Sequence, residues 1–165
     1  MNLENIDFVS WKDIPENIFP HNFLENDLSI KLSNCLMNFM NKKLLVSISA
    51  PMVGIRESVI VIRGIEHNYV MFNPRIVDVS EDVQVFEEAN PCYPGIIFKI
   101  SRHKSCRVRF QTPSGATDTK VFNGLSAKEI QHHLDILTSK EALLDRLNWF
   151  AKTKAKNILK KGKIK

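Results

Sequence analysis

A change in hydrophobic periodicity near Ser126 constrains the fold of this chain more than any other feature of its sequence. Before Ser126, short apolar and β-branched runs are separated by turn residues, as in the alternating run Cys106–Gln111 and the turn Thr112–Gly115 that follows it. After Ser126, apolar residues such as Ile130 and Leu134 recur at helical spacing. The sequence therefore predicts strands in the middle of the chain and helices in its last third.

The same patterns predict where individual elements lie. An irregular arm over residues 1–25 is followed by a helix from Asn26 that ends at Lys42–Lys43. Strands are expected at Ser58–Arg63, Tyr69–Phe72, Ile76–Val79, Val83–Phe86, Ile96–Ser101, Cys106–Gln111 and near Lys120–Phe122. No repeat or linker divides the chain. We therefore expect one domain over residues 1–148 and a Lys-rich extension over residues 149–165.

Two capping signals organise the predicted C-terminal helices. Ser126 and Glu129 form an S-x-x-E capping box, in which the two side chains satisfy the first free N–H groups of a helix. Thr138 and Glu141 offer a second signal of the same kind. The sequence thus predicts a helix that starts at Ser126, breaks near Thr138 and restarts toward Phe150.

The positive charge of the chain is confined to its end. The chain of 165 residues has a net charge of +5, but residues 151–165 hold seven lysines and no acidic residue, which leaves the first 150 residues with a net charge of −2. The body therefore gives no sign of a nucleic-acid-binding surface, whereas the extension suits an acidic protein or RNA.

Composition also bears on the compartment. With 44% hydrophobic and 25% charged residues, the sequence is typical of a globular protein, and no apolar run approaches the roughly 18 residues of a membrane span. The N-terminal segment is mixed and acidic, unlike a signal peptide. Cys35, Cys92 and Cys106 are widely spaced and odd in number, which suits a reducing compartment. We expect a protein of the cytoplasm, or of a virus or phage particle, without a membrane partner.

Three segments in order resemble the signature motifs of peptide deformylases, enzymes that remove the formyl group from new N-terminal methionines. Residues 45–54, LVSISAPMVG, resemble G-x-G-L-A-A-x-Q-x-G; residues 87–95, EEANPCYPG, resemble E-E-G-C-L-S-x-P-G; and residues 131–137, QHHLDIL, resemble Q-H-E-x-D-H-L. FNPRI at residues 72–76 and DRL at residues 145–147 also resemble family segments. The resemblance covers roughly residues 24–148. It implies an α+β fold with antiparallel sheets around a central helix that carries His132, and with N-terminal and C-terminal helices.

The resemblance also shows which metal ligands this chain would lack. Peptide deformylases bind a divalent metal such as iron, zinc or nickel through one cysteine and two histidines one helical turn apart. By position, the cysteine corresponds to Asn90, the first histidine to His132 and the second to Ile136. A hydrocarbon side chain cannot bind a metal, so we expect no metal cofactor here. Ile136 is expected to pack in an apolar environment.

The groups that carry out the family's chemistry are also replaced. The glutamate that serves as general acid and base corresponds to His133. The glutamine that holds the carbonyl oxygen corresponds to Met52, and the leucine whose backbone N–H binds the oxyanion corresponds to Pro91, which has no N–H. Removing a single oxyanion donor can cost about a hundredfold in rate. The sequence therefore predicts a catalytically inactive site.

Other interpretations of these residues stay open. Cys92, His132 and Asp135 could form a makeshift metal site, or they could be a buried thiol, a remnant histidine and a structural carboxylate. His133 adjoins His132 on a helix, so the two rings should diverge; it could be a base or simply a hydrogen-bonded histidine. Glu87–Glu88 should face opposite ways, with one carboxylate structural and the other solvated.

Two functions follow from these observations. The first is a non-catalytic protein that docks within a larger protein or ribonucleoprotein assembly, either associated with the ribosome or in a virus or phage particle; a small-molecule substrate is not expected. The second is a metal-dependent hydrolase with a rebuilt site. The expected docking residues are those of the extension: Trp149, Phe150, Lys152, Lys154, Lys156, Lys160, Lys161, Lys163 and Lys165.

Overall fold

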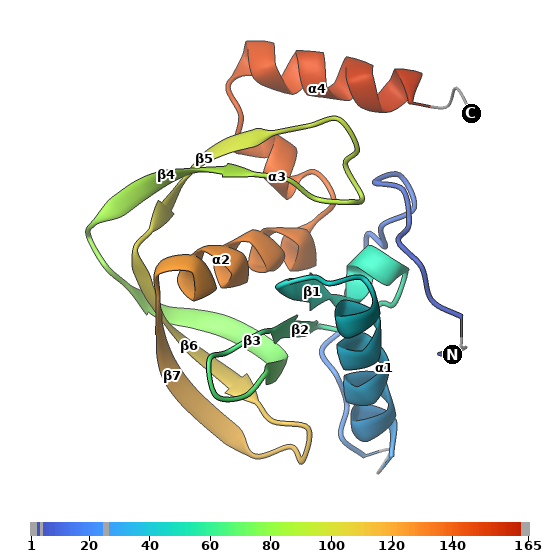
Figure 1. Cartoon of the computed structure of the whole chain (residues 1–165), viewed down its shortest axis with the longest axis vertical. Helices are drawn as coiled ribbons and strands as arrows, with labels where there is room; N and C mark the ends of the chain where they lie inside the picture. Colours follow the sequence, from blue (N-terminus) through green and yellow to red (C-terminus); the bar gives the residue numbers. More distant parts are fainter. Residues whose placement is uncertain (1–2, 4, 25–26, 163–165) are drawn as a thin grey trace.

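The computed structural model describes residues 3, 5–24 and 27–162. It is an α+β fold in which one helix is enclosed between two antiparallel sheets (Figure 1). The helical segments are α1 (Leu28–Lys42), the 3₁₀-helix η1 (Ala50–Val53), α2 (Gly124–Thr138), α3 (Ala142–Asp145) and α4 (Trp149–Lys161). Across the described ranges, no helix is both long and apolar enough to cross a membrane. The predicted antiparallel sheets around a central helix are confirmed.

The larger sheet has five strands in the order β1-β2-β3-β6-β7, and the smaller pairs β4 with β5. Their bounds are β1 (Ser47–Ser49), β2 (Val59–Ile62), β3 (Tyr69–Val79), β4 (Val83–Glu88), β5 (Phe98–His103), β6 (Ser105–Gln111) and β7 (Thr117–Asn123). Within the two sheets these seven strands pair antiparallel, and the burial of β5 and β6 alternates along each strand. This alternation presents one face of each strand to α2, as the period-2 pattern predicts.

Helix α2 is the centre of the molecule and contacts both apolar clusters. Ile136 belongs to the main cluster, which also contains residues of α1 and η1, whereas Ala127 and Ile130 belong to the cluster on the five-stranded sheet. Gln131 fixes the helix on β5: its carboxamide accepts a hydrogen bond from His103 N at 3.0 Å and donates one to His103 O at 2.9 Å. The helix that carries His132 and His133 is therefore held on several sides.

One prediction about the strands was wrong. The runs Tyr69–Phe72 and Ile76–Val79 were expected to be separate, but both belong to β3. Asn73 has a left-handed backbone with φ of 49°, and the register against β6 shifts between Phe72 and Arg75 and again between Ile76 and Asp78. An Asn-Pro pair usually marks a turn, but a β-bulge can absorb it inside a strand.

The predicted capping box was also wrong. Helix α2 begins at Gly124, two residues before Ser126, and its N-cap residue Asn123 makes no side-chain cap. Glu129 instead lies buried and accepts a hydrogen bond from Ser47 on β1. In many helices the glutamate of this motif bonds to the N-terminus of its own helix. Here Glu129 bonds instead to a residue far away in the sequence. The expected break after Thr138 is present, and the chain resumes as α3 and then α4.

The C-terminal helix is attached to the body. Ala155 and Leu159 are buried within the main apolar cluster, and Asn148 caps the helix by accepting a hydrogen bond from Ala151 N at 3.0 Å. Figure 1 shows α4 lying across the β4–β5 hairpin. The start of the expected extension at residue 149 coincides with the first residue of α4. The predicted start of α1 at Asn26 and the residues 163–165 fall outside the described residues.

Candidate functional site

The three motif segments meet at the buried face of α2. Met52 lies on η1, Asn90 and Pro91 lie in the loop after β4, and His132 and His133 lie on α2. All of them line one cavity of about 130 Å³, together with the polar side chains of Ser47 and Glu129. The structure thus brings together the degenerate positions that the sequence singled out.

Local sequence explains how η1 presents Met52. Pro51 occupies the first turn of this short helix, where its fixed φ fits and no N–H is required. Gly54 ends the turn with a left-handed φ of 78°, which a residue with a side chain rarely adopts. The Met52 carbonyl accepts hydrogen bonds from Val9 N at 3.0 Å and Cys92 Sγ at 3.4 Å. The backbone of η1 is therefore hydrogen-bonded both to the N-terminal arm, through Val9, and to the loop after β4, through Cys92.

His132 is hydrogen-bonded through both ring nitrogens. Its Nδ1 lies 2.6 Å from Glu88 Oε2, and its Nε2 lies 3.0 Å from Asn90 Nδ2. Burial opposes ionisation of Glu88, but hydrogen bonds from Arg102 and His132 outweigh it and lower the pKa of the carboxyl to about 2. An ionised carboxylate only accepts, so Nδ1 carries the proton and Nε2 presents its lone pair.

Asn90 occupies that lone pair. The side-chain Oδ1 of Asn90 accepts a hydrogen bond from Cys92 N at 2.9 Å, which turns its NH₂ group toward His132 Nε2. The same NH₂ group lies 3.7 Å from Met52 Sδ. A metal ion would need this lone pair of His132, so the amide of Asn90 takes the place of an ion as its partner.

A buried charge network continues from this histidine. Arg102 of β5, which is 1% exposed, donates to both oxygens of Glu88 at 2.8 and 2.9 Å and to Asp135 Oδ2 at 2.6 Å. Arg146 donates to the two oxygens of Asp135 at 3.0 and 2.6 Å. Asp135 is thus a structural carboxylate, as one of the open interpretations held. Glu87 is exposed whereas Glu88 is buried, which confirms the predicted division of this pair.

His133 has a separate set of partners. Its Nε2 lies 2.8 Å from Ser47 Oγ, and its Nδ1 lies 3.1 Å from Ser49 Oγ. Ser47 donates to Glu129, whose other oxygen is 2.6 Å from the ammonium of Lys128. Ser47 therefore accepts from His133 Nε2–H, and Nδ1 accepts from Ser49. Burial lowers the pKa of His133 to about 3, so the ring is neutral near pH 7. Both nitrogens are engaged within the protein.

The remaining positions are apolar or inert. Ile136 is fully buried in the main apolar cluster, as expected. Cys92 is also fully buried, and burial raises the pKa of its thiol to about 12, so it stays protonated. Asp135 is occupied by two arginines. Within residues 3, 5–24 and 27–162, no three His, Cys, Asp or Glu side chains lie where they could share a metal ion. The residues present do not fit the family's metal.

Ser47, Ser49, Glu129 and Arg102 are site residues that the sequence analysis missed. A signal was available for the two serines. They are two positions apart in a β-branched run, so their side chains leave β1 on the same face. Ser47 also stands at a glycine of the resembling motif, and an added hydroxyl there needs a partner. No comparable local signal pointed to Arg102.

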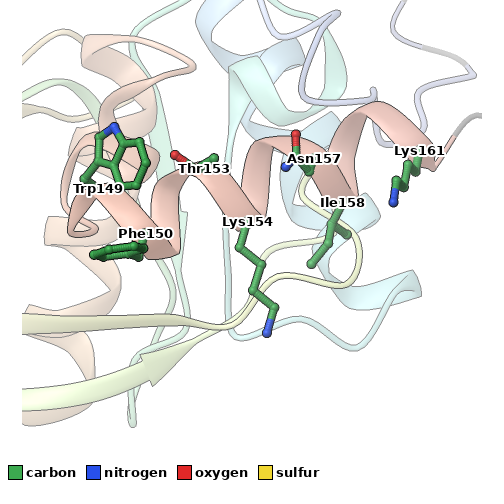
Figure 2. Close-up of a pocket in the computed structure, with 7 residues that line it drawn as sticks. All are labelled: Trp149, Phe150, Thr153, Lys154, Asn157, Ile158 and Lys161. Atoms are coloured by element: carbon green, nitrogen blue, oxygen red, sulfur yellow. The ribbon is translucent and has the colours of Figure 1, made fainter.

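The expected docking residues from Trp149 to Lys161 lie on α4, and they differ in how much they contact the rest of the chain. Trp149 and Phe150 are 71% and 79% exposed and stack edge to face with their ring centroids 4.9 Å apart. With Lys154, Ile158 and Lys161 they line a hollow of about 410 Å³. Figure 2 shows the two rings at the N-terminal end of the helix and the lysines farther along it.

The lysines of α4 divide into two groups. Lys152 pairs with Asp145, and Lys156 pairs with Glu141 at 2.7 Å, so both are neutralised by the body. Lys154, Lys160 and Lys161 have no ion pair with any described residue and are exposed. Lys163 and Lys165 lie outside the described residues. Among these three, Lys154 lies one turn from the aromatic pair, whereas Lys160 and Lys161 lie at the C-terminal end of the helix.

Comparison with known proteins agrees with these observations. The chain is 29% identical over 119 residues to a peptide deformylase of Thermotoga petrophila, which covers 72% of this chain and 69% of that protein. It is 34% identical over 120 residues to a peptide deformylase-like protein of Rickettsia conorii, with coverage of 70% and 63%.

Solved structures agree on the fold. A crystal structure of a peptide deformylase from Legionella pneumophila superposes with a TM-score of 0.81 at 22% sequence identity, covering 96% of this chain and 94% of the other. Residues 16–152, which include all three motif segments and the helix that carries His132, match the polypeptide deformylase family. This match spans most of the chain, and the chain accordingly belongs to the polypeptide deformylase family.

Proposed function

We propose that this chain is a non-catalytic member of the deformylase family that acts by binding another macromolecule. One observation carries the proposal. The Asn90 amide stands at the position of the family's metal-binding cysteine and donates to His132 Nε2 at 3.0 Å. The lone pair that a metal would require is thereby committed to a neutral amide, and Ile136 offers no second ligand.

The rest of the cavity supports the same conclusion. A general base must be free to take a proton from a bound molecule, but both ring nitrogens of His133 are engaged by serine hydroxyls. Pro91 supplies no N–H for an oxyanion. The cavity of about 130 Å³ is smaller than the roughly 300 Å³ at which small-molecule pockets begin.

The binding surface in this proposal is the exposed face of α4. We assign its partner as a protein segment that inserts an apolar side chain beside Trp149 and Phe150 and places acidic residues near Lys154 and Lys161. Aromatic residues with exposed rings are enriched at binding hot spots. Because two of the described lysines are neutralised by the body, a purely electrostatic RNA contact is the less favoured partner.

The catalytic part of the proposal is tested by metal content and deformylation. Wild-type protein is expected to hold far less than one iron, zinc or nickel per chain and not to deformylate a formyl-methionyl peptide. The variant Asn90→Cys/Ile136→His restores two family ligands beside His132 and should gain metal, which shows that the assay can detect a site. Near-stoichiometric metal in wild type, lost on His132→Ala and accompanied by deformylation, would establish the alternative of a hydrolase with a rebuilt site.

The binding part is tested by removing the aromatic pair. A Trp149→Ser/Phe150→Ser variant should lose at least tenfold in affinity for the native partner, which corresponds to about 1.4 kcal/mol. The control is Leu44→Ser/Ile65→Ser, which removes two equally exposed apolar side chains elsewhere. Binding that is unchanged by the aromatic substitutions but falls steeply with salt would assign the surface to RNA instead.

A further inference from the structure

A pocket on the five-stranded sheet holds two arginines and no counter-charge. Its volume is about 250 Å³, and it is lined by Asn73, Arg75, Arg109, Phe110, Gln111 and Thr117. Arg75 on β3 and Arg109 on β6 are direct cross-strand partners, so their side chains leave the sheet on the same face. Arg75 and Arg109 are both exposed to solvent.

This arrangement is electrostatically unfavourable on its own. Like charges directly opposite each other destabilise an antiparallel pair. Among the residues that the structure describes, neither Arg75 nor Arg109 forms an ion pair, and the pocket lining contains no carboxylate. The next outward-facing arginine of β6 is different, because Arg107 has Asp78 as its cross-strand partner. Arg107 thus has an acidic residue opposite it on β3, whereas Arg109 has another arginine opposite it.

The polar end of the pocket is held by partly buried hydrogen bonds. Asn73 Oδ1 accepts from His21 N at 2.7 Å, and its NH₂ group donates to His21 O at 3.1 Å and to Gln111 Oε1 at 2.8 Å. These contacts hold Asn73 in its left-handed conformation with φ of 49°. The polar end of the pocket is therefore set in place without any ligand, and Thr117 adds a hydroxyl at its edge.

We propose that this pocket binds a phosphate-type oxyanion between the guanidinium groups of Arg75 and Arg109. A guanidinium group is planar and donates two parallel hydrogen bonds, which matches the oxygens of a phosphoryl group. An anion at this point also removes the repulsion between the two arginines. The volume suits one phosphoryl group with a small substituent, so the ligand is free phosphate or the phosphoryl end of a small molecule. This site is separate from the cavity around His132 and does not depend on the function proposed for it.

The test is thermal unfolding of the full chain in a chloride buffer, with and without inorganic phosphate at equal ionic strength. Phosphate should raise the Tm of wild type by about 2 to 4 °C and leave the Tm of Arg75→Gln/Arg109→Gln unchanged. Arg107→Gln is the control, because it removes one arginine charge from β6 outside the pocket and should keep the full response to phosphate. An equal response in wild type and in the double variant, or no response in wild type, would overturn the proposal.

A second readout does not need the double variant to fold. Without phosphate and at low ionic strength, the single change Arg109→Gln should raise the Tm, because it removes the repulsion from Arg75. A Tm that falls contradicts the uncompensated pair on which the site rests. Titration of wild type with inorganic phosphate and with glycerol phosphate, followed by the side-chain Nε–H signals of the two arginines, distinguishes the sources. Tighter binding of glycerol phosphate assigns the phosphoryl end of a small molecule, and equal binding assigns free phosphate.

Discussion

The interior around His132 and the outer face of α4 satisfy their side chains in opposite ways. In the interior, Asn90, His132 and His133 all have hydrogen-bond partners within the chain, and the network continues through Glu88 and Arg102. On α4, Trp149 and Phe150 are exposed, and their rings stack edge to face on each other. A region whose hydrogen bonds are complete contributes to stability, whereas a region with uncovered aromatic rings is available to a partner. Substitutions in the two regions should therefore change the stability of the protein by different amounts.

The largest effect is expected from Arg102→Ala. This change leaves the buried Glu88 without a guanidinium partner and leaves Asp135 with Arg146 alone, and breaking a buried ion pair from one side costs about 3 to 5 kcal/mol. Chemical denaturation should show this loss in the free energy of unfolding. The control Arg107→Ala removes an exposed arginine from β6, the next strand along the chain, and should change stability by less than about 0.5 kcal/mol. A small effect of Arg102→Ala would show that the interior network is not structural.

The next largest effect should be a fall in the free energy of unfolding at acid pH, caused by protonation of His133. Its pKa is lowered to about 3 in the folded chain from an ordinary value of 6.5, so the unfolded chain binds the proton first. Stability contributed by the neutral ring is complete above pH 6.5 and is lost as the pH falls toward 3. Between pH 7.5 and pH 5 we expect a loss of about 2 kcal/mol, given 1.36 kcal/mol per pH unit.

The variant His133→Gln should flatten this pH dependence, since glutamine does not titrate. Glu88, with its pKa lowered to about 2, adds a second loss that begins only below its ordinary value of 4.5. Urea denaturation at a series of pH values separates the two windows. A wild-type stability that stays flat from pH 7.5 to pH 5 would contradict the buried, neutral His133.

Asn90→Ala is expected to cost less, on the order of 1 to 2 kcal/mol, because it leaves the buried His132 Nε2 and Cys92 N without a partner. The measurement is again chemical denaturation, now with and without added zinc. Loss of stability that zinc does not restore supports the amide as a structural partner. Recovery with zinc would show that His132 can still recruit a metal once the amide is gone.

The smallest effect on stability should come from the other region. Trp149→Ser/Phe150→Ser changes two exposed side chains, so the free energy of unfolding should stay within about 0.5 kcal/mol of wild type. Ala155→Asp is the internal comparison, since Ala155 is on the same helix but is buried in the main cluster and should be costly to replace. A large destabilisation by the two aromatic substitutions would show that the rings contribute to the stability of the fold.

Positions defined by local pattern were predictable from the sequence. The period-2 and helical runs placed most strands and the central helix, because alternation and helical spacing are properties of neighbouring residues. The same reasoning separated Glu87 from Glu88 and placed Ile136 in an apolar setting. The resemblance to the family's motifs implied that Met52, Asn90 and His132 share one site, and the structure places all three around one cavity.

Contacts between distant segments were decided only by the tertiary structure. Glu129 satisfies the pattern of a capping box but instead accepts a hydrogen bond from Ser47, which lies 82 residues away in the sequence. Arg102 had no local signal, yet it joins Glu88 and Asp135 within the core. Lys152 and Lys156 look like free charges in the sequence, but α3 and the residue before it bring acids to them. Sequence periodicity determines which face of an element is buried, whereas the partner of a buried or charged side chain depends on how those faces pack together.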